Sequence, residues 1–210
     1  MTGQLGTTVA VLEATLRCFS VSGIAKTTID DVAAASGVSR ATIYRMFQGG
    51  RDELVRDAVT LEIQRFFLRL TSAIDDAVDF ASRMESAVHF AHENIQNHRL
   101  YQTMLAEEPG VLLPLLTTQS EQVRDMVAGY LAPYLKLEQQ AGRTLSGVDL
   151  LAASQYVARL TISYIVNPGR DDLMNPDIVR RVVRRQMLGG ILTADALSRP
   201  GEPGVPPESS

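Results

Sequence analysis

Apolar residues recur every three or four positions along most of this chain, and strict alternation of apolar and polar residues is rare. The first spacing is typical of helices with one buried face, and the second of strands. The sequence therefore predicts an all-α fold. The predicted helices cover about Thr8–Ser22, Arg51 to Asp75 or Asp76, Asp79–Asn97, Arg99–Ala106, Thr118–Gln140, Gly147–Val166 (capped by Ser146) and Asn175–Leu192.

Two further short helices, joined by a glycine turn, are predicted between residues 27 and 54. Thr28 is a candidate N-cap of the first helix, and Asp31 places a carboxylate near the positive end of its dipole. Gly37 falls where this helix must stop, because glycine adopts the left-handed backbone there without strain. Ser39 is predicted to cap the second helix, which runs to Phe47. The pattern is that of a helix-turn-helix.

The second of these helices presents a surface that fits a DNA groove. Two short helices around a glycine also occur in all-α proteins that never meet DNA, so the flanking residues decide between the two readings. A helix ending before Gly23 precedes the unit, and another helix begins at Arg51 after it. The exposed residues are predicted to be Arg40, Ala41, Thr42, Tyr44 and Arg45.

From Val9 to Ala58 the chain resembles the N-terminal DNA-binding domain of the TetR family of transcriptional regulators. The resemblance is carried by Phe19 and Gly23, a double threonine, the A-x-x-x-G-V-S turn and the I-Y-R-x-F run. One departure is the Gly49-Gly50 pair, which makes the next connection one residue longer than in most members. The resemblance implies a cytoplasmic repressor that binds a double-stranded DNA operator as a dimer and responds to a small-molecule effector.

These residues allow specific expectations for the DNA contacts. Arg40 and Arg45 are expected to read a base or a phosphate, and Thr42 to touch a base edge or a phosphate. Two recognition helices of a dimer would enter successive major grooves roughly 34–36 Å apart, so the operator is expected to be a pseudo-palindrome. The residues expected to position the DNA backbone are Thr28, Ser39, Tyr44 and Arg51.

Three regions are predicted along the chain. Residues 1–50 form a three-helix helix-turn-helix domain that binds DNA, and residues 51–197 form a helical domain for ligand binding and dimerisation. Residues 198–210 are rich in proline, glycine and serine, a composition typical of a flexible tail.

Aromatic residues and methionines at helical spacing fill the middle of the second domain. Singly, each such residue is typical of plain core, but together they fit an apolar cavity with a few polar groups, such as His89, His92 and Gln102. The family resembled has a ligand pocket in this region. No cluster of buried charges is evident, which favours an uncharged or amphipathic organic molecule. The residues expected to line the pocket are Phe66, Phe90, Tyr101, Met104, Met126 and Tyr130.

The last two long helices, Ser146–Val166 and Asn175–Leu192, are apolar on most sides. Such a helix must be buried on most sides. In the family resembled, this pair meets its twin in a four-helix bundle, which would place Leu160 and Val183 at a homodimer interface. The alternative is a central core helix within one chain.

Composition and charge narrow the reading further. With 45% hydrophobic residues, the chain can form a buried core. It has no apolar run of about 18 residues, so no membrane-spanning helix is predicted. The single Cys18 excludes an intrachain disulfide, and no signal peptide is recognisable at the first residues. The net charge of −4 lies wholly in residues 61–210, because residues 1–60 hold six basic and six acidic side chains. Phosphate attraction then depends on the local placement of arginines, not on the total.

Motifs for enzymatic chemistry are missing from the sequence. It has no phosphate-binding glycine loop, H-E-x-x-H, C-x-x-C or G-x-S-x-G, so neither an enzyme nor a cofactor is expected. His89 and His92 lie near Glu85 and Glu93, but a metal site would need ligands from another segment. The alternative to a regulator is a helical ligand-binding or scaffold protein without specific DNA recognition, which the weak positive charge of the first domain favours.

Overall fold

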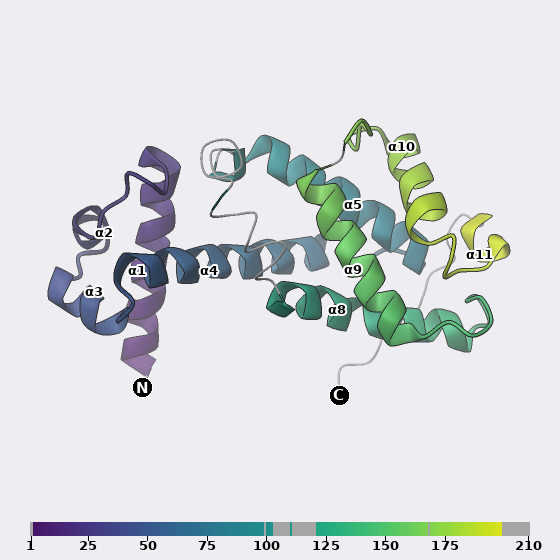
Figure 1. Cartoon of the computed structure of the whole chain (residues 1–210), viewed down its shortest axis with the longest axis horizontal. Helices are drawn as coiled ribbons and strands as arrows, with labels where there is room; N and C mark the ends of the chain where they lie inside the picture. The colour runs from purple at the N-terminus through teal and green to yellow at the C-terminus, as the bar shows by residue number, and fades with distance from the viewer. Residues whose placement is uncertain (1, 99, 103–109, 111–120, 168, 199–210) are drawn as a thin grey trace. The chain divides into compact units, whose positions relative to one another are not determined.

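The computed structural model describes residues 2–98, 100–102, 110, 121–167 and 169–198. Helices form nearly all the regular structure of these residues, and the exception is one isolated antiparallel bridge between Thr144 and Leu192 (Figure 1). The predicted all-α class is confirmed. No helix among the described residues combines the length and the apolar character needed to cross a bilayer.

The described residues divide into two compact units, and the first comprises those within Met1–Arg69 and Gln96–Leu113. It contains α1 (Thr2–Ser22), α2 (Ile29–Ser36), α3 (Arg40–Met46) and most of α4 (Gly50–Ala73). Phe19 of α1, Ile43 of α3 and Leu54 of α4 are almost completely buried, so each of these helices has one buried apolar side. The domain boundary predicted near residue 50 stays a prediction.

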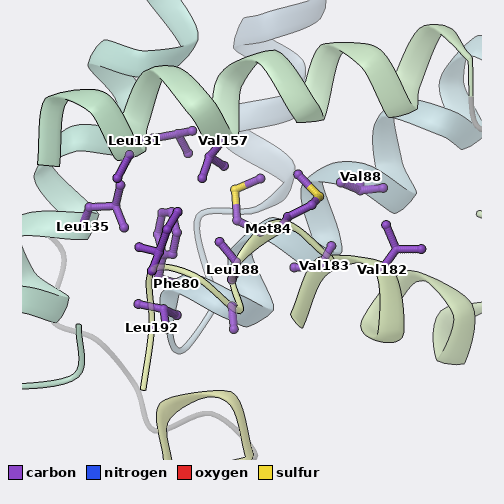
Figure 2. Close-up of a cluster of buried hydrophobic side chains, with 14 of the residues drawn as sticks. Phe80, Met84, Val88, Leu131, Leu135, Val157, Val182, Val183, Leu188 and Leu192 are labelled. Carbon is purple, nitrogen blue, oxygen red and sulfur yellow. The ribbon is translucent and has the colours of Figure 1, made fainter. Parts of the chain in front are cut away.

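The second unit comprises the described residues within Leu70–Ile95 and Pro114–Ser210. It contains most of α5 (Phe80–Asn97), and then α8 (Glu121–Gln140), α9 (Leu150–Val166), α10 (Pro176–Arg181), the π-helical turn η1 (Val182–Met187) and α11 (Ala194–Ser198). Figure 2 shows its core, in which side chains from four elements meet. Labelled there are Phe80, Met84 and Val88 of α5, Leu131 and Leu135 of α8, Val157 of α9, and Val182, Val183, Leu188 and Leu192 near the C-terminal end.

The ends of the last helices differ from the prediction at two points. Ser146 is not the cap of α9, because the Asp149 carboxylate accepts hydrogen bonds from the backbone N–H of Leu151 (2.9 Å) and of Ala152 (3.2 Å). The final helix does begin at an Asn175 cap, as predicted, but its regular α-helical part stops at Arg181.

Beyond Arg181 the backbone continues as the π-helical turn η1, which ends at Met187 and not at Leu192. A Cβ atom at Gly189 would lie 2.7 Å from the Arg185 carbonyl oxygen. The backbone therefore leaves no room for a side chain at Gly189, directly after the turn.

The apolar residues of the final helix are buried within the chain itself. Val182 and Val183 are completely buried in the core of the second unit, and Ile191 and Leu192 belong to the same core. The expectation that Val183 lies at a dimer interface is therefore wrong, and Leu160 is half-buried against the same core. The central-core alternative holds for this part of the chain.

Two other sequence expectations fall mainly outside the described residues. Of the helix predicted over Arg99–Ala106, the structure describes only residues 100–102, which are helical. Met104 lies outside the described residues, and so does the tail beyond Ser198.

Candidate nucleic-acid interface and effector region

The start of α2 is held by a reciprocal pair of hydrogen bonds. The Thr28 hydroxyl accepts from the Asp31 backbone N–H at 3.2 Å, and the Thr28 backbone N–H donates to the Asp31 carboxylate at 2.8 Å. This capping box satisfies two backbone donors that a helix start leaves free. Hydrogen bonds from the side chain and backbone of Thr28 lower the pKa of Asp31. The predicted cap is confirmed.

The turn between α2 and α3 also has the predicted form. Gly37 has a φ of +71° and donates its backbone N–H to the Ala33 carbonyl at 3.0 Å, which ends α2. The Ser39 hydroxyl accepts from the Thr42 backbone N–H at 3.3 Å and donates to the Thr42 hydroxyl at 3.0 Å. Ser39 is therefore the N-cap of α3, as predicted. Its hydroxyl group bonds both the backbone and the side chain of Thr42 in the first turn of α3.

The helix α3 has one buried side and one exposed side. Ile43 is completely buried and anchors α3 in the core of the first unit. Tyr44 is 49% exposed, so much of its ring and its hydroxyl group are accessible to solvent. Arg40, Ala41 and Arg45 are also exposed, whereas Thr42 is half-buried. The exposed residues are those expected from the sequence to face DNA.

The two arginines of α3 have different surroundings. The Nε atom of Arg40 lies 2.8 Å from a carboxylate oxygen of Asp30 on α2, and each of these side chains is 60% exposed. Arg45 makes no ion pair with another residue in the described part of the chain. The charge of Arg45 is therefore directed to solvent, while that of Arg40 is partly balanced by Asp30.

Arg51, expected near a phosphate, holds the connection between α1 and α2. Its Nε donates to the Thr27 carbonyl oxygen at 3.0 Å, and its Nη2 donates to the carbonyl oxygen of Ile24. The side chain thus ties the start of α4 to the loop that precedes α2. A phosphate contact of Arg51 stays a prediction.

In the first unit, two residues of the predicted pocket pack against each other. The rings of Phe66 and Tyr101 meet edge to face with centroids 5.9 Å apart. The Tyr101 hydroxyl donates to the Glu62 carboxylate, and Arg69 donates to that carboxylate and to the Tyr101 hydroxyl, each at 2.9 Å. Burial and the hydrogen bond to Glu62 raise the pKa of Tyr101 far above its usual value. This polar cluster was not predicted from the sequence, because Glu62 and Tyr101 are 39 residues apart.

In the second unit, Tyr130 lies beside a buried arginine, Arg83, whose burial was not predicted from the sequence. Arg83 of α5 is only 4% exposed and donates to the Tyr130 hydroxyl at 3.0 Å. Its guanidinium also lies 4.1 Å above the centre of the Tyr134 ring. Burial, above all, raises the pKa of Tyr130 to about 12.

The six predicted pocket residues are therefore not all in one unit. Phe66 and Tyr101 belong to the first unit, and Phe90, Met126 and Tyr130 to the second. Phe90 and Met126 are both half-buried. A pocket shared by these residues stays a prediction.

The two histidines of α5 have different partners. The Nδ1 atom of His89 lies 3.0 Å from the Leu173 carbonyl oxygen. His92 is 6% exposed, and its Nδ1 has no hydrogen-bond partner among the residues that the structure describes. Burial lowers the pKa of His92, which favours the neutral imidazole. Within the described residues, no group of three or more histidine, cysteine or acidic side chains could hold a metal ion.

Solved structures share this fold at low sequence identity. A TetR-family transcriptional regulator from Pectobacterium atrosepticum superposes with a TM-score of 0.69, at 17% identity, covering 92% of this chain and 97% of that one. The TetR-family repressor AlkX from Dietzia sp., implicated in biodegradation of n-alkanes, superposes with a TM-score of 0.61 at 19% identity. The match covers 89% of this chain and 97% of AlkX. SmeT in complex with triclosan superposes with a TM-score of 0.58 at 19% identity, and the match covers 97% of this chain and 100% of SmeT. SmeT is the repressor of a Stenotrophomonas maltophilia multidrug efflux pump.

Sequence comparisons identify the family. Comparison with curated protein sequences gave no match. Two family profiles do match: residues 11–58 fit the bacterial regulatory proteins of the tetR family, and residues 79–185 fit the C-terminal domain of the bacterial tetracyclin repressor. The second match alone covers more than half of the chain. The chain belongs to the TetR family of bacterial transcriptional regulators.

Proposed function

We propose that this protein binds a pseudo-palindromic DNA operator as a homodimer and releases it when a small, largely apolar organic ligand binds. The observation that carries the DNA-binding part is the helix α3. It follows a left-handed turn at Gly37, is capped by Ser39, and is anchored by the buried Ile43. Its opposite side presents Arg45 and the exposed Tyr44 to solvent.

The chemistry of these side chains fits the reading of a major groove. An arginine can donate two hydrogen bonds to the O6 and N7 atoms of guanine, which is the commonest specific contact. Arg40 at the start of α3 and Arg45 five residues later could each make such a contact. Thr28 and Ser39 stand at helix starts, where hydroxyl and backbone N–H groups can bind phosphates.

The dimer is proposed to form through α9 and the elements beside it. On α9, Leu151 is 66% exposed, although it is a large apolar side chain. The Tyr156 hydroxyl lies 3.4 Å from the Gln186 carbonyl oxygen, which places α9 beside η1. Two such helical pairs from two chains would form a four-helix interface and cover Leu151.

The charged groups buried in the described residues favour an uncharged effector. The Arg83 guanidinium binds carbonyl groups of its own chain, and Glu138 binds Arg143 at 2.6 Å. Neither charge is left for a ligand. SmeT, which shares the fold, has been solved with triclosan, a small organic compound. A screen by thermal shift, paired with measurement of operator release, would identify the effector.

Selection of bound fragments from random duplex DNA tests the DNA-binding part directly. The full-length chain is expected to enrich a pseudo-palindrome, and its affinity should fall steeply as salt rises, because each phosphate contact releases counterions. If no motif is enriched and binding does not depend on salt, the protein is a helical scaffold or ligand carrier and the proposal is wrong.

A further inference from the structure

We propose that Asp30 determines the sequence specificity of this regulator by holding Arg40 in the orientation that reads one guanine of each half-site. The inference rests on the proposed function, because it assigns a positioning residue to the same DNA-binding surface. Its observation is the 2.8 Å contact between the Nε atom of Arg40 and the Asp30 carboxylate.

The two side chains start from backbones that are themselves fixed. Asp30 is the second residue of α2, whose start is held by the capping box of Thr28 and Asp31. Arg40 is the first residue of α3 and follows the Ser39 cap. The carboxylate and the guanidinium therefore start from two helix ends that are both held by capping hydrogen bonds.

The contact leaves the recognition atoms of Arg40 available. A guanidinium carries five N–H groups, and the ion pair with Asp30 lies on its Nε side. The atom of Arg40 that forms the ion pair at 2.8 Å is Nε, which lies on the inner side of the guanidinium from its two Nη groups. With Nε held from behind, the two Nη groups can form the parallel pair of hydrogen bonds that fits the O6 and N7 atoms of guanine. Less side-chain freedom is then lost on binding.

Stability does not explain why a carboxylate stands at this position. An ion pair in which both side chains are 60% exposed contributes little to folding. A carboxylate on the surface that faces DNA also repels phosphates, which weakens binding to any sequence. The repulsion lowers affinity for operator and random DNA alike, so only the ordering of Arg40 by Asp30 acts on the ratio between specific and non-specific binding.

Selection from random duplex DNA with three variants of the full-length chain tests this inference. Arg40→Ala identifies the guanine position, because its preference should disappear from the enriched motif. Asp30→Asn keeps Arg40 but removes the carboxylate charge, and should reduce the preference at the same position about two- to fivefold, the range that an exposed ion pair can supply. Asp52→Asn is the matched control, since Asp52 is an exposed acid in the first turn of α4. It removes the same charge and should leave the motif unchanged.

Affinity for a random duplex provides a second measurement. Both Asp30→Asn and Asp52→Asn should raise it, but only Asp30→Asn should narrow the gap between operator and random DNA. If Asp30→Asn enriches the wild-type motif with every preference intact, or if Arg40→Ala changes no position, the inference is wrong while the proposed function stands. A wild-type chain that enriches no motif at all would overturn both.

Discussion

Replacing the buried Arg83 with methionine should lower the free energy of unfolding of the second unit more than replacement of an exposed arginine does. The Nη1 atom of Arg83 donates to the Ile74 carbonyl oxygen at 2.8 Å, and Nη2 donates to those of Asp75 (3.1 Å) and Ala77 (3.3 Å). These carbonyl groups belong to the turn that follows α4. Methionine has similar length but cannot donate a hydrogen bond, so the turn would lose its connection to α5.

The expected loss can be worked from these contacts. A hydrogen bond from a charged donor contributes about 1.5–3 kcal/mol, and the cation–π contact with Tyr134 adds roughly 0.5–2 kcal/mol. Removing the guanidinium also removes its own desolvation cost, which offsets part of that sum. We therefore expect Arg83→Met to lower the free energy of unfolding by about 2–4 kcal/mol. Arg83→Lys should lose less, because one ammonium group can still reach a carbonyl but cannot span three.

Urea unfolding followed by circular dichroism, at one fixed protein concentration, measures this loss. Arg170→Met is the control, because Arg170 is exposed in the same unit, and it should change the free energy of unfolding by less than about 0.5 kcal/mol. If Arg83→Met behaves like Arg170→Met with an unchanged m-value, the guanidinium does not stabilise the turn and the reasoning is refuted.

Three further predictions concern the turn, the buried histidine and the dimer. Gly37→Ala forces a residue with a Cβ into φ +71°, so calorimetry should show a loss of about 1–2 kcal/mol and operator affinity should fall; an unchanged melting temperature would contradict the strain. Burial, with a smaller contribution from His89, lowers the pKa of His92 against the opposing effect of Asp172. The unfolded chain then takes up this proton at a higher pH, so the stability that His92 contributes is complete above about pH 6.5 and is lost on acidification. Melting temperatures of His92→Phe should decline less between pH 7 and 5, and a parallel decline would disprove the assignment. Leu151→Asp should give a folded monomer by light scattering, whereas a persistent dimer would place the interface elsewhere.

The helix-turn-helix could be predicted closely because its signals are local. Thr28, Gly37 and Ser39 act on backbone groups within four residues of themselves, so their spacing alone defines the caps and the turn. The same holds for the Asn175 cap of α10. Between Ser146 and Asp149, two residue types that both cap helices, the sequence offered no decision, and the hydrogen bonds of the structure made it.

Contacts between distant parts of the chain could not be predicted in this way. Arg51 binds a carbonyl group 24 residues earlier, and Arg83 contacts a tyrosine 47 residues later. Nothing in the spacing around either arginine distinguishes it from an exposed one. The burial of Val183 was misjudged for a related reason, since a helix covered by its own chain and one covered by a partner have the same apolar pattern.

The two units are interleaved along the sequence, and this has a consequence for engineered or naturally recombined regulators. The described residues within Gln96–Leu113 belong to the first unit, although most of α5 before them and the chain after them belong to the second. Tyr101 contacts Glu62 and Phe66 of α4, although it follows them by more than 30 residues in the sequence. A single junction placed directly after α4 would therefore separate Tyr101 from both residues. A hybrid made by joining the helix-turn-helix unit to a foreign C-terminal domain at one crossover would leave Glu62 and Phe66 facing an unrelated segment. Replacing the first unit by that of another protein therefore requires exchange of two separate segments of the chain. A hybrid made by recombination at a single point would lose the contacts of Tyr101 and is expected to be less stable.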